Sequence, residues 1–363
     1  FLMKRRPPRS TPSNSSAASD VYKRQLYTHT RLFSANGRSN ITIEGNESTF
    51  QMRKEEYLKL PPKGHTNQRH IIILNGCTNI RISGLTLKDA GGDGILVWGS
   101  KNYEQAYCKN IVIEDVNFVN NNRAGIQVGS VDGLSIHNCV FSGVPRGGEG
   151  AGLHFEPDHN YDRLANIIVR DTQFENNNGT DLVIGFHNLR SSSDVPVLQD
   201  VSMLFENITI TGSVAFKGYK HGISITYLYD DGPNGFVRFK NVTVDNKIVP
   251  TSIYAKSYFK ARVSFENCIW KNTPLNHNNA VILIGGGPNY GGIDFINCQV
   301  FDSEDRPAIR FKGKNLYDVK GDIYIQNAIR KGSLCDWGST KRHNIGLQLH
   351  AGIADFCKEQ VKP

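Results

Sequence analysis

Long hydrophobic runs are absent from this sequence of 363 residues. The longest apolar stretches, such as Ile71 to Leu74 and Ala280 to Ile284, have the length of one strand, whereas a membrane-spanning helix needs about 20 apolar residues. No membrane span is therefore expected. Hydrophobic residues make up 39% and charged residues 21% of the chain, which favours a folded globular or solenoid protein over a disordered one.

Cysteine is scarce as well. The seven cysteines include no pair with CxxC spacing, which excludes the common zinc and redox motifs. An odd number of cysteines in a chain of this length also excludes a dense disulfide scaffold.

Acidic residues are nearly missing from the first 25 positions, where six basic residues face Asp20 alone. This segment therefore carries +5 of the formal net charge of +8 and leaves +3 for the rest. Ser15 to Gln25 agrees residue by residue with a translated transposase-type sequencing adapter, and Arg5 to Thr11 resembles the flow-cell end of the same adapter. We interpret residues 1–25 as a non-native head and expect the gene fragment to begin near Leu26, without the native N-terminus or any signal peptide.

The remainder has no basic stripe with interleaved aromatic residues, so nucleic-acid binding is not expected.

A repeat is the strongest positive signal. Eight segments align on one column of residues that tolerate a left-handed backbone. The column contains Gly84, Asp115, Asn138, Asp171, Asn207, Asn241, Asn267 and Asn297. Apolar residues alternate on both sides of it, as in Met203/Phe205 before Asn207 and Ile208/Ile210 after it, which predicts two short strands joined by a bend. Thr172 is the one polar residue in this inward set, at a site where its hydroxyl can bond to the backbone.

A third alternating strand follows in each repeat. Spacings between bends run from 23 residues (Asp115 to Asn138) to 36 residues (Asp171 to Asn207), so the strands are constant and the loops vary. Such a pattern is typical of a stacked coil. With an Asn at the tight bend, it resembles the right-handed parallel β-helix of the pectate-lyase-like superfamily, over residues 40–327. The resemblance implies an all-β, single-stranded solenoid of about nine coils in residues 26–327, and we expect residues 328–363 to cap its open end.

The stacked coils predict where the cysteines lie relative to one another. Equivalent residues of adjacent coils lie about 4.8 Å apart, and buried thiols that fill apolar columns are favoured over disulfides there. Two pairs share columns, and one pair in the tail is expected to form a bridge. These pairs are Cys77/Cys108 and Cys268/Cys298 in the columns, and Cys335/Cys357 in the tail.

The resemblance also implies that substrate lies across the face made by the third strand of each coil. Alternation predicts the outward rows Leu96/Trp98, Gln127/Gly129, His154/Glu156, Val183/Gly185, Ser224/Thr226, Tyr254/Lys256, Ile282/Ile284 and Arg310/Lys312. The densest group of reactive side chains lies in "GLHFEPDHNYDR", residues 152–163, and neighbouring coils add further acids and bases. The candidate catalytic residues are His154, Glu156, Asp158, His159 and Asp181. The candidate substrate-binding residues are Asp93, Trp98, Arg123, Gln127, Arg163, His187, Tyr254 and Lys256.

Short motifs leave the reaction open. "FEPDH" resembles the Phe-Asp-Pro-His stretch of mannuronan epimerases, with Glu156 in place of Asp and with Asp158 intervening before His159. The motifs of polygalacturonase-type hydrolases and of pectate lyases are absent. Asp93 in "AGGDGI" is open to two interpretations, a turn residue or a Ca²⁺ ligand together with neighbouring acids.

Three functions follow as hypotheses. The main one is a polysaccharide lyase or epimerase acting on a uronate-containing glycan, in which Arg or Ca²⁺ neutralises the sugar carboxylate and His154 or His159 removes the adjacent proton. Tyr254 or a second histidine would then protonate the leaving oxygen. The alternatives are a glycoside hydrolase with a carboxylate pair among Asp93, Glu156, Asp158 and Asp181, and a non-catalytic glycan-binding or structural solenoid. We expect an anionic polysaccharide partner, a monomer, and a secreted, periplasmic or cell-surface location.

Overall fold

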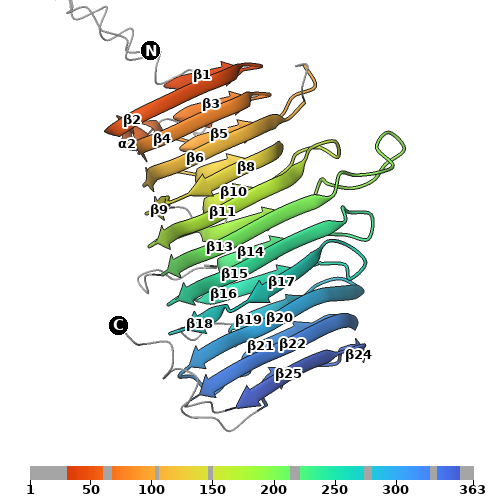
Figure 1. Cartoon of the computed structure of the whole chain (residues 1–363). Coiled ribbons are helices and arrows are strands. Elements are labelled where there is room, and N and C mark those ends of the chain that lie inside the picture. The colour runs from red at the N-terminus through yellow and green to blue at the C-terminus, as the bar shows by residue number, and fades with distance from the viewer. Residues whose placement is uncertain are drawn as a thin grey trace, which may run out of the picture.

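The computed structural model describes residues 31–59, 68–102, 106–145, 150–212, 221–273, 280–327 and 333–351. Two parallel sheets run the length of a solenoid (Figure 1). We call the eleven-stranded sheet of short strands the front sheet and the fourteen-stranded sheet of long strands the back sheet.

The front sheet takes one short strand from each coil. Its strands, in spatial order, are β1 (Phe33–Asn36), β3 (Ile72–Asn75), β5 (Ile95–Trp98), β7 (Ala124–Val128), β10 (Ala151–Phe155), β12 (Thr180–Gly185), β14 (His221–Thr226), β16 (Val249–Tyr254), β19 (Ile282–Gly285), β21 (Ile309–Lys312) and β23 (Cys335–Asp336).

The back sheet contains the bent pairs of strands, most of them continuous through the bend. Its main path is β2 (Ser39–Gln51), β4 (Thr78–Lys88), β6 (Cys108–Val119), β8 (Val131–His137), β11 (Leu164–Glu175), β13 (Val201–Thr211), β15 (Gly235–Asp245), β17 (Arg262–Glu266), β20 (Asn289–Asp302), β22 (Asn315–Asn327) and β24 (Lys341–His343). Three strands complete it beside this path: β9 (Val140–Ser142), β18 (Ile269–Lys271) and β25 (Gly346–Ala351).

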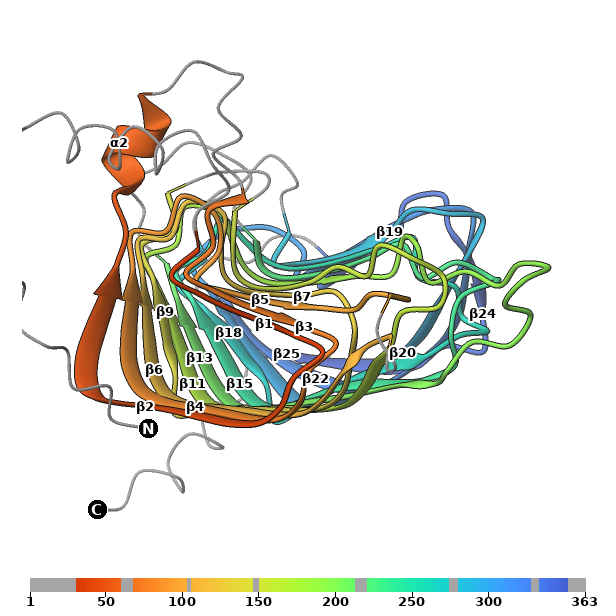
Figure 2. The same ribbon diagram turned by 90° about the horizontal axis from the view of Figure 1, so that it is seen from above.

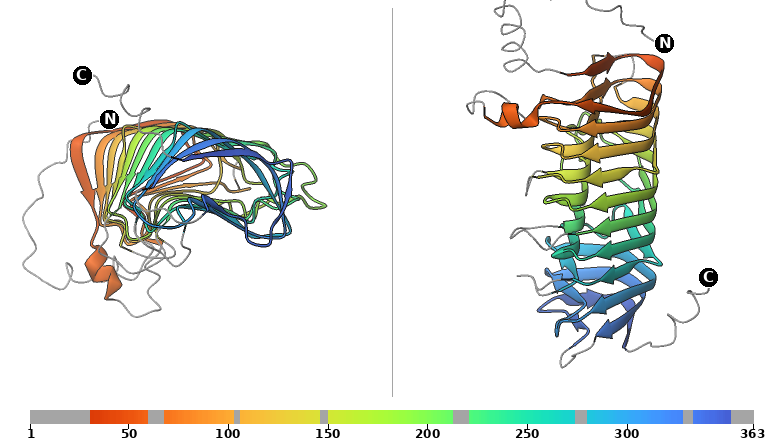
Figure 3. Two further views of the ribbon diagram at one scale, coloured as in Figure 1. Left: turned by 90° about the horizontal axis from the view of Figure 1, so that it is seen from below. Right: turned by 90° about the vertical axis from the view of Figure 1, so that its left-hand side faces the viewer.

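Both sheets follow the same coil order, so each turn of the chain adds one strand to each sheet. Seen from above, the coils lie one over another (Figure 2). Their inward apolar side chains form the hydrophobic core. The predicted parallel β-helix is therefore confirmed, and the eleven-stranded front sheet extends the expected nine or so coils to eleven in the described residues. The single helix among these residues, α2 (Lys54–Leu58), lies beside the coils near the N-terminal end (Figure 3).

The predicted bend column is confirmed at all eight positions, where φ lies between 50° and 61°. Its side chains form a ladder between coils: the Asn207 amide donates to Asp171 at 2.9 Å, and the Asn241 amide donates to Asn207 at 3.0 Å. Two further left-handed columns were not predicted. They contain Asn40, Asn79, Asn110 and Asn166, and Asp89, Asn120, Asn176, Asn246 and Asn272.

Aromatic rings stack inside the coils in the same register. Phe118, Phe141 and Phe174 lie 4.6 and 4.8 Å apart between ring centroids. Buried Thr172 donates its hydroxyl to the carbonyl of Arg170 at 2.8 Å, as the sequence predicted. Burial of these inward rows supplies most of the favourable free energy of folding.

The expected register of two front strands was wrong. Strand β16 ends at Tyr254, and Ala255 turns the chain with φ of 53°, so Lys256 is buried rather than outward. In β19, Ile282 and Ile284 face the core, whereas Leu283 is the half-buried residue of that strand. Alternation fails at the first site because a left-handed residue interrupts the extended backbone.

Parallel pairing continues beyond residue 327. Strand β23 pairs with β21, and β24 and β25 pair with β22, so this part of the tail adds another coil. The six described cysteines are buried free thiols, as the column argument predicted for the two paired columns. Cys335 is one of them, and Cys357 lies outside the described residues. No helix in the described part of the chain is long and apolar enough to span a membrane.

Candidate functional site

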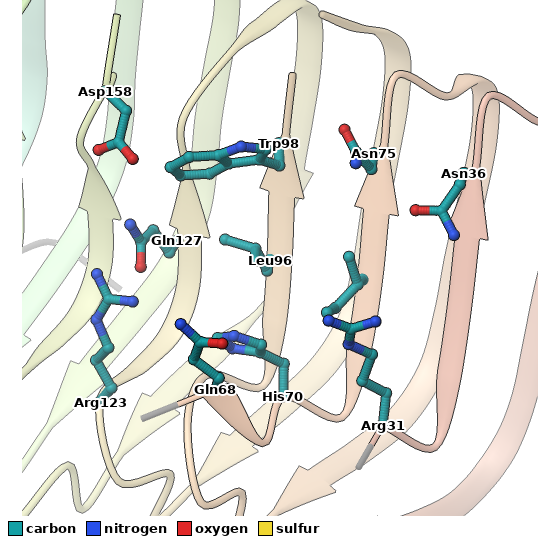
Figure 4. A pocket seen from close by; sticks show the side chains of 11 residues that line it. Arg31, Asn36, Gln68, His70, Asn75, Leu96, Trp98, Arg123, Gln127 and Asp158 are labelled. Atoms are coloured by element: carbon teal, nitrogen blue, oxygen red, sulfur yellow. The ribbon is translucent and has the colours of Figure 1, made fainter. Parts of the chain in front are cut away.

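A groove of about 450 Å³ lies on the outer face of the front sheet, over the first coils (Figure 4). Its position follows from strand register, because outward residues of adjacent parallel strands stand side by side. Asn75 pairs with Trp98, and Leu96 pairs with Gln127, which in turn pairs with His154. The groove is lined by Arg31, Asn36, Gln68, His70, Ile73, Asn75, Leu96, Trp98, Arg123, Gln127 and Asp158.

Glu156 lies just past the end of β10 and contacts two residues that line the groove, Arg123 and Gln127. Its Oε2 accepts hydrogen bonds from Arg123 at 3.2 Å and from the amide of Gln127 at 3.1 Å. The Glu156 side chain is 42% exposed, whereas Gln127 is buried and so holds a fixed position. Two donors on one oxygen hold the Glu156 carboxyl group at a defined place on the face.

Arg123 connects Glu156 to a buried acid. Its other terminal nitrogen lies 3.8 Å from Oδ2 of Asp93, which is fully buried at the start of β5. Nδ1 of His70 lies 3.0 Å from the same oxygen and accepts the backbone N–H of Asp93 at 3.1 Å. The backbone N–H of Asp93 thus holds the His70 ring at the groove, and the buried Asp93 carboxylate is itself out of reach of a substrate.

His154 lies in the middle of β10, between Gln127 and Val183 of the adjacent coils. Its side chain is 14% exposed, and its Nδ1 lies 3.8 Å from Oε2 of Glu156. Desolvation lowers the pKa of His154, and Arg123 lowers it further, against the opposite effects of Glu156 and Asp93. The imidazole is therefore neutral at pH 7 and able to accept a proton.

Asp158 follows Pro157 at the end of the same strand and lines the groove next to Trp98 (Figure 4). Desolvation raises the pKa of its carboxyl, and the negative charge of Glu156 raises it further. Its backbone N–H donates to Oδ2 of Asp162 at 2.9 Å, and His159 N–H donates to the same oxygen at 2.8 Å. Asp162 thus fixes the turn that presents Asp158.

His159 belongs to this turn and has a different environment from His154. Its ring stacks on Tyr161 at 4.7 Å between centroids, and its Nδ1 lies 3.5 Å from Oδ2 of Asp162. It is exposed and does not line the groove. Arg163, predicted to bind substrate, lies over the ring of Tyr107 at 4.2 Å and 3.5 Å from Asp132, which places it at the back-sheet side of the turn.

Two predicted site residues are buried away from the groove. Asp181 is fully buried and pairs with Nζ of Lys247 at 2.5 Å, and Asn177 donates to its other oxygen at 2.8 Å. Lys256 is 1% exposed and donates to the carbonyl of Ser257 at 2.8 Å. Burial of Lys256 lowers its pKa to about 7. Neither side chain can contact a glycan on the outer face, so their predicted roles are corrected.

The two remaining candidates, His187 and Tyr254, lie on the same face but toward the C-terminal coils. The His187 ring meets Tyr227 edge to face at 5.5 Å, and Tyr227 meets Tyr254 in the same manner at 5.8 Å. The structure thus divides the predicted set into an acid and base centre around Glu156 and an aromatic cluster around Tyr227.

Sequence reasoning missed His70, Arg31, Gln68 and Asn75 as groove residues. Asn75 could have been found, since it occupies the outward position of β3 that Trp98 occupies in β5. The other three precede their strands, in segments without alternation, so no pattern indicated their direction.

Calcium binding by Asp93 does not fit its surroundings. Its carboxylate faces a guanidinium and an imidazole, which are not partners of a metal-bound oxygen ligand set. Within the described residues no three His, Cys, Asp or Glu side chains gather as a metal site would require.

The sequence and the structure were compared with known protein families, curated proteins and solved structures. No protein-family model matches the sequence. No curated protein matches it either. Among solved structures, it is similar to a family 28 exopolygalacturonase of Yersinia enterocolitica, with a TM-score of 0.41 and 10% sequence identity over 78% of this chain and 48% of that one. The chain therefore spans about half the length of that protein.

Proposed function

We propose that this protein is a carbohydrate-active enzyme that removes a proton from a uronate-containing glycan, as a polysaccharide lyase or epimerase. The observation that carries the proposal is the composition of the groove next to His154. Two guanidinium groups, Arg31 and Arg123, and four side-chain amides line it together with one carboxyl group, that of Asp158. Such an excess of donors suits a sugar carboxylate and ring hydroxyls.

The residues can be assigned to the steps of elimination. Arg123 would bind the sugar carboxylate and stabilise the negative charge that develops on it, and Arg31 would contact a neighbouring part of the glycan. Neutral His154 would accept the proton from the carbon next to that carboxylate. Asp158, whose raised pKa keeps its proton to a higher pH, would donate a proton to the leaving oxygen. In an epimerase the proton would instead return to the opposite face of the same carbon.

Glycoside hydrolysis is the second candidate, favoured by the contrast between Glu156 and Asp158. These carboxyl groups lie two residues apart at the end of β10, one receiving two hydrogen bonds and the other with a raised pKa. A glycosidase needs two neighbouring carboxyl groups, one of which donates a proton to the leaving oxygen, and the raised pKa of Asp158 suits that role.

One assay separates the two reactions. The protein is incubated with polygalacturonate, alginate and a neutral glucan, while the ultraviolet absorbance of unsaturated uronate and the release of reducing ends are followed. Both signals rise together for a lyase, and reducing ends rise alone for a hydrolase. An epimerase gives neither signal and is detected by the change in uronate composition of the polymer.

Variants then test the assignment. His154→Ala should abolish elimination, because His154 stands beside the groove residue Gln127. His159→Ala should retain it, because the exposed His159 ring stacks on Tyr161 in the turn beyond the strand. His137→Ala serves as a matched control, since His137 lies on the back sheet and pairs with Glu114 at 2.8 Å. Full activity of His154→Ala would remove the proposed mechanism. A polysaccharide substrate also favours the secreted, periplasmic or cell-surface location.

A further inference from the structure

A cluster of exposed aromatic rings lies on the outer face of the front sheet, several coils beyond Glu156. Tyr254 is 48% exposed and Tyr227 is 38% exposed, although large hydrophobic groups are usually covered. His187 and Tyr229 complete the cluster, with centroid distances of 5.5 Å and 6.0 Å from Tyr227. The proposed reaction uses none of these side chains.

Tyr227 is held there by an unusual backbone. Its φ is 63°, a left-handed conformation that is rare for an aromatic residue. Its N–H still donates to the carbonyl of Tyr254 at 3.0 Å, so the turn remains locked to the next coil. Strain of this kind persists where surrounding structure enforces it and is concentrated at functional sites.

The Tyr254 ring packs directly against the backbone of Gly286 in the next coil. A Cβ atom at Gly286 would be 2.4 Å from Cε2 of Tyr254, so only a bare backbone leaves room for the ring. Trp98, which lines the groove over the first coils, has a similar neighbour, since a Cβ atom at Gly129 would be 2.6 Å from its Cε3. Trp98 and Tyr254, which belong to the same outward row, therefore each pack against a glycine of the following coil.

The row between these rings is open. The strand register runs from Gly185 through Thr226 to Tyr254. One residue beyond the pairs Val97/Val128, Phe155/Val128 and Phe155/Ile184, the same alignment brings Trp98 and Glu156 into this row. A Cβ atom at Gly185 would meet nothing nearer than 3.5 Å, so the floor next to Glu156 is low and unobstructed. Five strand steps separate β5 from β16, which at about 4.8 Å each gives about 24 Å.

Polar groups flank the cluster on its far side. Arg190 lies over the ring of Tyr229 at 4.7 Å and holds Asp231 through its Nε at 2.9 Å. Both line a second cavity of about 540 Å³ together with Tyr229, Ser257 and Asn289. Flat aromatic faces suit the apolar faces of pyranose rings, and adjacent fixed donors and acceptors suit their hydroxyls.

We propose that Tyr227 and Tyr254, with His187, form a second sugar-binding subsite that stacks on a pyranose of the same glycan chain whose reacting unit lies at His154 and Asp158. The inference rests on the proposed function and adds that the substrate is a long polymer bound internally. A glycan too short to span from Asp158 to Tyr254 would not use this subsite.

The test combines binding and turnover with the full chain. Tyr227→Ala/Tyr254→Ala is compared with wild type, and Tyr324→Ala is the matched control, because Tyr324 lies on the back sheet and stacks on His350. Affinity electrophoresis in gels containing polygalacturonate, alginate or a neutral glucan measures binding at about 0.15 M salt, where surface charges are screened. Turnover is measured on the polymer that is processed and on its disaccharide.

The double variant should bind the polymer about tenfold more weakly, which corresponds to about 1.4 kcal/mol. Its KM for the polymer should rise by a similar factor with kcat unchanged, and its disaccharide turnover should equal that of wild type. If no polymer is processed but one retards wild type and not the double variant, the subsite stands and the proposed reaction fails. Equal retardation of wild type and double variant, or no retardation of wild type by any polymer, would overturn the subsite.

Discussion

The chemistry of single residues in this protein is set by how deeply each side chain is buried. His154, Glu156 and Asp158 follow one another at every second position of one strand and its end, yet they differ in environment. His154 is desolvated and neutral, Glu156 receives two hydrogen bonds, and Asp158 has a raised pKa. Alternation in the sequence predicted that these groups share a face, but their protonation depends on neighbouring coils that no local pattern describes.

Histidines whose pKa is lowered should make the fold sensitive to acid. Burial lowers the pKa of His221 to about 4, whereas the unfolded value is about 6.5. Below pH 6.5 the unfolded chain binds the proton more readily, so this contribution to stability is present at pH 7 and is lost as the pH falls. At pH 5 the loss is about 2 kcal/mol. Between pH 7 and pH 5, urea unfolding should show a loss of stability that is larger in wild type than in His221→Asn by about this amount, and equal losses in both proteins would contradict it.

At the scale of elements, the bends are what make the strands stack in register. The left-handed column was predictable because Asn, Asp and Gly are the residues that adopt this conformation at low cost. The turn at Ala255 was not, because Ala carries no such signal, and the orientation of Lys256 was lost with it. The ion pair between Asp181 and Lys247 could not be predicted from the sequence either. It joins residues of different coils, which come together only in the folded solenoid.

Replacing a bend residue tests this explanation. Asn241→Ala should lower the free energy of unfolding by about 2 kcal/mol, because Ala pays the left-handed penalty and the ladder to Asn207 and Asn267 is lost. Asn241→Gly should cost less, since glycine adopts the same φ freely. Asn117→Ala, at an exposed strand position, should stay within about 0.5 kcal/mol of wild type. Urea titrations give the free energy of unfolding of the three variants. Equal losses for Asn241→Ala and Asn241→Gly would contradict the role of the left-handed backbone at this position.

Some glycines of the front strands are needed for packing, and others leave the outer face open. Alanine substitutions at Gly125 and Gly185 distinguish these two roles. A Cβ atom at Gly125 would lie 2.4 Å from the ring of Phe141 and 2.7 Å from the carbonyl oxygen of Gly152, whereas one at Gly185 has space. Gly125→Ala should therefore destabilise the protein by about 2 to 3 kcal/mol. Gly185→Ala should melt like wild type and yet raise the KM for the polymer, because its methyl group rises from the floor of the row between Glu156 and Tyr254. Thermal unfolding and steady-state kinetics check both, and an unchanged KM for Gly185→Ala would remove that row from the binding surface.

For the whole molecule, the charge is distributed unevenly. Residues 1–25 carry +5 of the formal net charge of +8, so most of the attraction of the chain for a polyanion is expected to come from this segment. Such attraction is long-ranged and sensitive to salt, and it is independent of the groove.

Removal of residues 1–25 should therefore weaken binding to alginate and heparin at low salt and leave kcat and KM at about 0.15 M salt unchanged. Retention on a heparin column as a function of salt, and turnover of the same two proteins, provide the measurement. A fall in kcat after removal would mean that the head takes part in the reaction, against its interpretation as an adapter.

The regular spacing of the bends also bears on how the chain reaches its native state. Each strand pairs with the strands of the preceding and following coils, so partners are never more than a few tens of residues apart along the chain. Loop-closure entropy is then small for every pairing, and no strand waits for a partner from the opposite terminus. Once a few coils have formed, their open edge is a template on which the next segment adds. A chain that emerges progressively from a ribosome or a secretion pore can therefore fold as it appears, one coil at a time.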